Sequence, residues 1–221
     1  MILRFNNRVL TYSGLTLNYV PQLEYFSGGT LSGWTVNGGG TGFPTIDNTF
    51  GNPLPSFKIT GANQSFKRSL PSGTTFHNKT ITFDWYPNAG ADIGFLFAQN
   101  NGGNGSNRAS LRMYQIATPY KQGLGSVDNG GWLYLGDPSY SPIPEVSAIF
   151  TSANTWYNIK IRVTSNRVCT WFVNGRQQLS TYTLPAGYTT GNTSDNYFGF
   201  LGNNLGGTSY IDNLTIYSGI L

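Results

Sequence analysis

A two-residue alternation of apolar and polar side chains recurs along this chain, whereas the 3.6-residue period of a helix is almost absent. In the segment 157–163 (YNIKIRV), isoleucine and valine side chains alternate with Asn, Lys and Arg. The same alternation occurs in 79–85 (KTITFDW), 92–99 (DIGFLFAQ), 110–114 (SLRMY) and 131–136 (GWLYLG). Successive side chains of a strand point to opposite faces. The pattern therefore predicts strands that turn one face to a core and the other to solvent.

Turn residues separate these segments and indicate an antiparallel arrangement. The chain contains 29 glycines, and Asn174-Gly175 after RVCTWFV is a strong signal for a two-residue hairpin. Hydrophobic residues make up 38% of the 221 residues, enough for one large core. We expect an all-β fold, a two-sheet antiparallel jelly-roll sandwich over residues 22–221. Residues 1–21 end in a proline and precede the alternating pattern, so they are expected to form a short N-terminal arm.

The charge and cysteine content argue against several classes of partner. Only 10% of the residues are charged, and the formal net charge is +4 with a pI of about 9.2. The basic residues are scattered, with Lys67-Arg68 as the one adjacent pair, which predicts no binding of nucleic acid. No apolar run approaches the roughly 20 residues of a membrane-spanning helix, so we expect no membrane insertion. The single cysteine, Cys169, is expected to be a small buried hydrophobe.

Motifs for catalysis are absent from the sequence. Glycoside hydrolysis usually needs two carboxylates that face each other across the scissile bond. The only glutamates, Glu24 and Glu145, lie in unrelated segments, and the strand that carries Asp84 has no second acid. The lone histidine, His77, is expected at the surface beside a turn, without a nucleophile motif nearby. We therefore expect a protein that is not an enzyme.

Three motifs, in order and spacing, resemble the concanavalin A-like lectin/glucanase superfamily, and in particular its laminin G-like and carbohydrate-binding modules. They are LEYFSGGTLSGWTVNGGG at 23–40, TWYNIKIRVTSNRVCTWFVNGRQ at 155–177 and SYIDNLTIY at 209–217. The resemblance covers roughly residues 22–219 and implies a jelly-roll sandwich closed by the last strand. A shared fold does not by itself fix a function.

The last motif contains a carboxylate in an unexpected position. Strand alternation places Asp212 on the same face as Tyr210, Leu214 and Ile216, which have the character of core residues. A buried carboxylate without a partner is costly. The sequence therefore predicts a partner for Asp212.

The resemblance implies one such partner, because the matching aspartate in several of these modules helps to bind a structural calcium ion. Asp212 would be a ligand, with Glu24 in the opening segment or Asp47 in TIDNTFGNP as further candidates. Calcium takes six to eight oxygen ligands, several of which backbone carbonyls can supply. The alternative is that Asp212 accepts backbone N–H bonds from the loop at 28–29 or 37–42.

Aromatic side chains on the polar faces of the strands are the candidates for ligand or subunit contact. Trp132 and Tyr134 point the same way from one strand, Tyr114 and Arg112 form a similar outward pair, and Tyr140 lies in a loop. Such residues stack against sugars, form protein–protein contacts or pack under long loops. Trp34, Trp85, Trp156 and Trp171 are instead predicted to pack in the core or against loops.

The absence of a secretory signal and the start RFNNRVLTYSG, which is similar to the openings of bacteriophage structural proteins, suggest a setting for the sandwich. We expect a virion surface protein, on the capsid or the tail, made in the host cytoplasm and able to bind glycans. Its partners would be other virion proteins, contacted through residues 1–21 and exposed aromatics in a homo-oligomeric assembly. The alternative is a carbohydrate-binding module of an exported bacterial protein.

Overall fold

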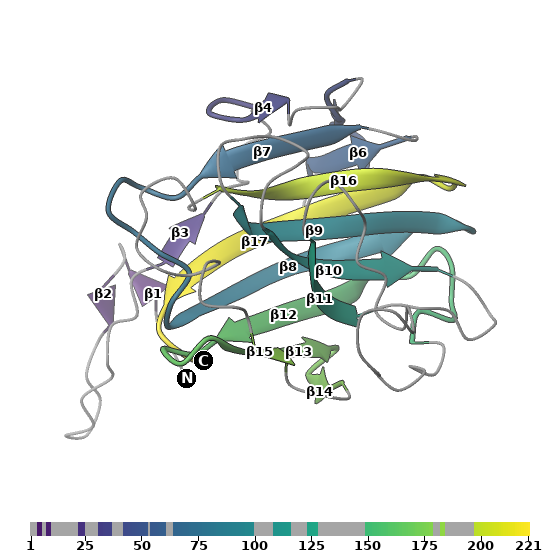
Figure 1. The fold of residues 1–221 in the computed structure, drawn as a ribbon. Coiled ribbons are helices and arrows are strands. Elements are labelled where there is room, and N and C mark those ends of the chain that lie inside the picture. Colours follow the sequence, from purple (N-terminus) through teal and green to yellow (C-terminus); the bar gives the residue numbers. More distant parts are fainter. Residues whose placement is uncertain are drawn as a thin grey trace.

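The computed structural model confirms an all-β sandwich of two antiparallel sheets (Figure 1). It describes residues 4–5, 8–9, 22–24, 31–36, 42–52, 54–60, 64–99, 108–115, 123–127, 149–178, 182–183 and 197–221. All regular elements in this part of the chain are strands. None of the described residues belongs to a helix that is long and apolar enough to cross a membrane.

The sheet at the front of Figure 1 has six strands. In spatial order they are β11 (Gly123–Val127), β10 (Arg108–Tyr114), β9 (Ala91–Gln99), β16 (Tyr197–Gly206), β7 (Ser65–Ser69) and β4 (Thr35–Val36). The sheet behind it has nine strands. They are β14 (Arg176–Gln177), β13 (Val168–Val173), β12 (Tyr157–Val163), β8 (Lys79–Pro87), β17 (Ser209–Ser218), β6 (Ser56–Ile59) and β5 (Thr45–Asp47), with β15 (Tyr182–Thr183) beside β13 and β3 (Gln22–Glu24) beside β17.

The core lies between the two sheets and is rich in phenylalanine. Phe83 of the nine-stranded sheet contacts Phe95 and Phe200 of the six-stranded sheet, with ring centroids 5.1 and 5.3 Å apart. Each fully buried side chain of this size contributes about 1.5–3 kcal/mol to folding. Trp34, Trp85 and Trp171 are buried here, and the half-buried Trp156 stacks on Phe50 of the loop after β5, so all four pack as the sequence predicts. Cys169 is also buried, with no exposed surface.

The hairpin predicted at Asn174-Gly175 joins β13 to β14. Both residues have positive φ, +50° and +79°, which a type I′ turn requires at its two central positions. The strand predicted at 131–136 lies outside the described residues.

A β-bulge in β17 overturns the predicted phase of Asp212. Ile211 pairs with Trp85 and Asp212 with Asp84, but the next pair is Thr215 with Thr82, so the register shifts between them. Asn213, with a φ of +52°, is where β17 leaves the extended conformation.

The two halves of β17 therefore alternate in opposite phase. Leu214 and Ile216 belong to the core cluster, as does Ile211, whereas Tyr210 and Asp212 lie on the outward face of the sheet. The expectation that Asp212 shares a face with Leu214 and Ile216 is wrong, because strict alternation does not hold across a bulge. Asp212 is nevertheless only 3% exposed.

The described part of the N-terminal arm is one pair of two-residue strands. β1 (Arg4–Phe5) and β2 (Arg8–Val9) pair antiparallel and form a sheet separate from the two large ones. β3 is the first strand that joins the sandwich, where Glu24 pairs with Thr215 of β17. Docking of residues 1–21 on another chain remains a prediction.

Candidate functional site

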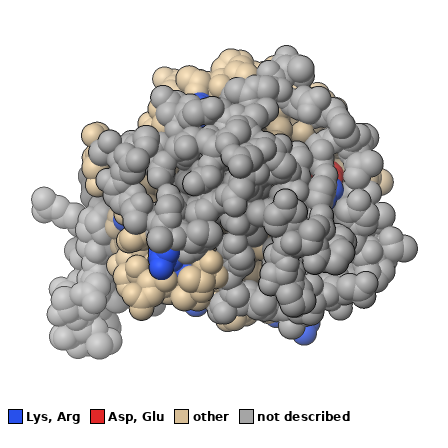
Figure 2. Space-filling view, in the orientation of Figure 1, with Lys and Arg blue, Asp and Glu red and all other residues tan. Residues whose placement is uncertain are grey.

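Outward-pointing side chains of the six-stranded sheet form a largely buried layer that combines polar groups with glycines. We call it the polar face and define it by two rows of paired residues that cross the strands. One row is Thr35, Lys67, Gly199 and Leu96, and the other is Ser65, Leu201, Gly94 and Arg112. Their strand neighbours, such as Phe66, Phe95 and Phe200, point into the core. Figure 2 shows this side of the molecule, on which the charged side chains of the described residues form small separate patches.

A bidentate ion pair between Arg112 and Asp92 lies at one end of the polar face. The Arg112 Nε donates to Oδ1 of Asp92 at 3.0 Å, and the Nη2 donates to Oδ2 of the same carboxylate. Asp92 and Arg112 are 4% and 3% exposed. Bidentate pairs of this kind are strong and fix both side chains. Arg112 points outward, as the sequence predicts, but its side chain is buried against Asp92, and its role as a contact residue stays a prediction.

The other end of the polar face is more open. The Lys67 Nζ lies 4.7 Å from the centroid of the Tyr197 ring, a cation–π distance. Burial lowers the pKa of Lys67, because the charged ammonium is removed from water. Tyr197 is half-buried, and Thr35 next to Lys67 is exposed. An aromatic ring and an ammonium therefore meet here, although Lys67 is only 7% exposed, and Thr35 lies on the other side of Lys67 on the edge strand β4.

Ser65, Gly94 and Gly199 are the small residues of the polar face. Ser65 is fully buried, and its Oγ has no hydrogen-bond partner within the described part of the chain. Gly199 can carry no side chain, because a Cβ there would lie 2.0 Å from the carbonyl oxygen of Phe66. Glycine in a strand interior often marks a place where another backbone or a ligand approaches closely.

The predicted aromatic contact residues are only partly placed. Arg112 and Tyr114 share β10, and the backbone of Tyr114 pairs with Asp92. Trp132, Tyr134 and Tyr140 lie outside the described residues, so their role stays a prediction. Sequence reasoning missed Asp92, Lys67 and Tyr197. Asp92 could have been found, because in DIGFLFAQ it takes the phase opposite to that of Ile93, Phe95 and Phe97.

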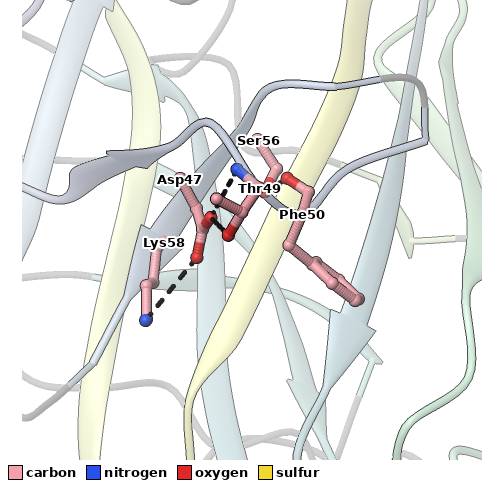
Figure 3. Close-up of polar contacts among 5 residues, drawn as sticks. All are labelled: Asp47, Thr49, Phe50, Ser56 and Lys58. Atoms are coloured by element: carbon pink, nitrogen blue, oxygen red, sulfur yellow. Dashed lines mark hydrogen bonds and ion pairs between the residues drawn. The ribbon is translucent and has the colours of Figure 1, made fainter.

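The carboxylates predicted as calcium ligands bind separate partners. Asp47 accepts the backbone N–H of Thr49 at 2.9 Å and its hydroxyl at 2.7 Å, and Lys58 Nζ lies 3.6 Å from its other oxygen (Figure 3). The hydrogen bonds from Thr49 are the main cause of the lowered pKa of Asp47.

Asp212 binds a loop amide and the bulge. It accepts the backbone N–H of Asn52 at 2.5 Å and that of Asn213 at 2.7 Å. The Asn213 amide in turn donates to the carbonyl of Asn52 and to Asp84, 2.7 Å away. Asn158 donates to the other oxygen of Asp84 at 2.8 Å. Burial raises the pKa of Asp212, the two backbone N–H bonds oppose this shift, and the charge of Asp84 adds to it.

These contacts fit the loop-amide alternative for Asp212, although the amide comes from Asn52 and not from the loops at 28–29 or 37–42. N–H groups point their positive ends at the carboxylate, an arrangement that suits a calcium ion poorly. No three His, Cys, Asp or Glu side chains of the described residues are placed to hold a metal ion. Calcium binding by Asp212, Asp47 and Glu24 stays a prediction.

Residues 23–216 match the family model of the 3-keto-alpha-glucoside-1,2-lyase-like domain. The chain belongs to this family. A search of curated proteins finds no match to the chain. The domain is therefore placed by its family model and by its fold.

Three solved structures illustrate the likeness in fold. The carbohydrate-binding module CBM66 from Bacillus subtilis is 16% identical, with 84% of this chain and 96% of that chain covered at a TM-score of 0.51. A carbohydrate esterase from the Shiga toxin-encoding bacteriophage phi24B is 13% identical, with 86% and 92% covered at 0.52. A lectin from Bauhinia forficata, solved with GalNAc, is 12% identical, with 90% and 97% covered at 0.51. At such identities the likeness concerns the fold alone.

Proposed function

We propose that this domain binds glycans without catalysis and that the polar face of the six-stranded sheet is its binding surface. The family is described by sugar chemistry, and the similar folds include a carbohydrate-binding module and a lectin. Both facts support a carbohydrate ligand. The position of the ligand rests on the geometry of the polar face.

The observation that carries the proposal is the group of Tyr197, Lys67 and Thr35 at the open end of this face. A sugar ring has an apolar C–H face, for which a tyrosine ring offers contact area, and a rim of hydroxyl groups. The Lys67 ammonium lies over that ring, and Thr35 lies next to Lys67 on the neighbouring strand, so both could bind the hydroxyl groups of a sugar. A few placed polar groups around an apolar contact are typical of small-molecule sites.

The arrangement of the acids supports binding without turnover. Asp92 is held on both oxygens by Arg112, so it is a poor candidate for a mobile general acid or base. Asp84 and Asp212 face each other in the other sheet, where amide groups donate to the oxygens of both. Retaining and inverting glycosidases need two carboxylates that are free to reach the scissile bond or a water molecule.

A pair of substitutions at Tyr197 tests the proposed site. On an array of bacterial and plant polysaccharides, Tyr197→Ala should weaken retention by at least about tenfold, which corresponds to about 1.4 kcal/mol. Tyr197→Phe keeps the ring and should bind within about threefold of the wild type. Melting temperatures of both variants serve as folding controls. Equal retention of Tyr197→Ala and wild type, or no retention of the wild type on any polysaccharide, would overturn the proposal.

The proposed setting is the surface of a bacteriophage particle. The fold occurs in an esterase of a bacteriophage, and the chain starts with a segment similar to the openings of phage structural proteins. Particles assembled with a chain that lacks residues 1–21 should contain less of this protein, measured by mass spectrometry. Unchanged incorporation would favour the alternative setting, an exported bacterial carbohydrate-binding module like the one from Bacillus subtilis.

A further inference from the structure

A second surface, on the outward side of the nine-stranded sheet, collects positive charge. Lys160 and Arg162 alternate with core residues on β12, so both point outward. Arg167 lies in the turn from β12 to β13. Lys79 begins β8 but pairs with the core residue Val163, so it does not belong to this outward face. Burial lowers the pKa of His77, and the charges of Arg167 and Lys79 add to this shift. We call Lys160, Arg162 and the adjacent positions on β8 and β13 the basic face.

Phe172 lies beneath the two outward cations. The Lys160 Nζ is 4.8 Å and the Arg162 Cζ 4.6 Å from the centroid of its ring. The ring itself is only 7% exposed. The Nε of Arg162 is buried and has no hydrogen-bond partner in the described part of the chain. Two positive charges therefore lie side by side over one aromatic ring, and the Arg162 Nε–H donates no hydrogen bond to a described residue.

No ion pair joins Lys160 or Arg162 to another described residue. The ion pairs of Lys58 with Asp47 and of Arg112 with Asp92 lie outside the basic face. The acid on this side of β8 is Asp84, whose two oxygens accept amide hydrogens of Asn158 and Asn213. Burial lowers the pKa of Lys160, and the charge of Arg162 adds to this shift.

We propose that the basic face binds an anionic polysaccharide through carboxylate or sulfate groups on its sugars. Lys160 and Arg162 would bind the anionic groups, since a guanidinium can bind both oxygens of a carboxylate at once. Thr82 pairs with Lys160 and Thr170 with Arg162, so hydroxyl groups flank both cations and can bind sugar hydroxyls. This surface lies on the opposite sheet from the polar face, and the inference does not depend on the proposed function.

The same observations disfavour two other polyanions. Single-stranded nucleic acid is usually held by bases stacked on exposed aromatic rings, and Phe172 is covered. An anionic membrane surface is usually bound together with apolar groups that enter it. The exposed large apolar side chains among the described residues are Val36, Phe43, Leu54, Ile220 and Leu221, none of which belongs to β12 or β13.

Binding to polygalacturonate, with its fully methyl-esterified form as the neutral control, tests the inference. The wild type should bind the acid form, more weakly at 200 mM than at 50 mM salt, and should not bind the ester. The double variant Lys160→Gln with Arg162→Gln should lose at least about tenfold in affinity. Lys160→Gln alone, which leaves Arg162 in place, should lose a smaller factor and covers the case of a misfolded double variant. Lys58→Gln removes the same charge elsewhere on this sheet and should bind within twofold of the wild type.

The possible outcomes separate this surface from the polar face. Tyr197→Ala should bind polygalacturonate as the wild type does, even if it fails on the neutral polysaccharides of the array. A loss in Tyr197→Ala with no loss in the Lys160 and Arg162 variants would place the anion on the other sheet and overturn the inference. The inference is also overturned if neither polygalacturonate nor dextran sulfate binds, or if the methyl ester binds as well as the acid form. A DNA oligonucleotide or phosphatidylserine vesicles that displace the polysaccharide, at a lower concentration of negative charges than the polysaccharide itself carries, would overturn it as well.

Discussion

At the scale of single residues, Asp212 is a buried carboxyl group whose ionised form is disfavoured by its surroundings. Burial and the nearby charge of Asp84 raise its pKa above the ordinary value of 3.8, although two backbone N–H bonds oppose the shift. A carboxyl group with a raised pKa binds more protons in the folded than in the unfolded state at pH values between the two pKa values. Its contribution to the free energy of unfolding must therefore fall as the pH rises through that interval.

This sign can be measured with the variant Asp212→Asn, which cannot ionise. The free energy of unfolding of the wild type, relative to the variant, should be larger at pH 4 than at pH 7, and constant above the raised pKa. Urea unfolding of both proteins from pH 3.5 to 8 gives this difference directly. If the stability of the wild type relative to Asp212→Asn instead grew with rising pH, the backbone N–H bonds would outweigh burial, and the pKa of Asp212 would be lowered.

The same residue shows what could not be predicted from the sequence. The cost of a buried carboxylate correctly predicts a partner for Asp212. Its partner, the N–H of Asn52, is 160 positions away in the chain and belongs to a loop with no regular pattern. Sequence spacing carries no information about which backbone amide such a loop turns inward.

At the scale of the strand, alternation correctly predicted β8, β9, β10 and β12, because each of these strands faces the core through a complete run of alternate residues. It misplaced half of β17, because one residue at positive φ reverses the phase of every residue after it. Asn tolerates this conformation better than most residues, but asparagines are common in this chain, and Asn213 was not distinguishable from the others.

The bulge can be tested at Asn213 itself. Asn213→Gly keeps the positive φ but loses the amide bonds to Asn52 and Asp84, whereas Asn213→Val also forces a β-branched residue into a strained conformation. We expect urea unfolding to rank stability as wild type, then Asn213→Gly, then Asn213→Val, with about 1–3 kcal/mol between the last two. Equal stability of the glycine and valine variants would show that the positive φ carries no strain.

At the scale of the whole molecule, the two-sheet sandwich followed from repeated alternation, turn chemistry and three motifs in order. The faces proposed to bind ligands could not be predicted in this way. The polar face joins Thr35, Lys67, Gly199 and Leu96, which come from four strands far apart in the chain and meet only through the strand order of the sheet. Isolated polar residues on separate strands have no common pattern in the sequence, so the face could not be predicted before the strand order was known.

The distribution of acids over the two sheets leads to a last prediction, which concerns the domain as a whole. Four aspartates on the outward faces accept hydrogen bonds from N–H or hydroxyl groups: Asp92 from Arg112, Asp84 from two amides, Asp47 from Thr49 and Asp212 from two backbone N–H groups. A carboxylate that accepts these hydrogen bonds must break at least one of them before that oxygen can exchange a proton with a substrate. A polysaccharide retained by the domain should therefore be recovered unchanged.

Mass spectrometry of bound and released oligosaccharides, after incubation for hours at several pH values, checks this expectation. A 3-keto-glucoside should be included among the substrates, because the family is named for lyase chemistry on such sugars. Turnover that survives in the variant Asp92→Asn but disappears in Asp212→Asn would assign catalysis to the Asp84–Asp212 pair. Turnover that disappears in Asp92→Asn alone would turn the polar face from a binding surface into an active site, because Arg112 would then position a reactive carboxylate.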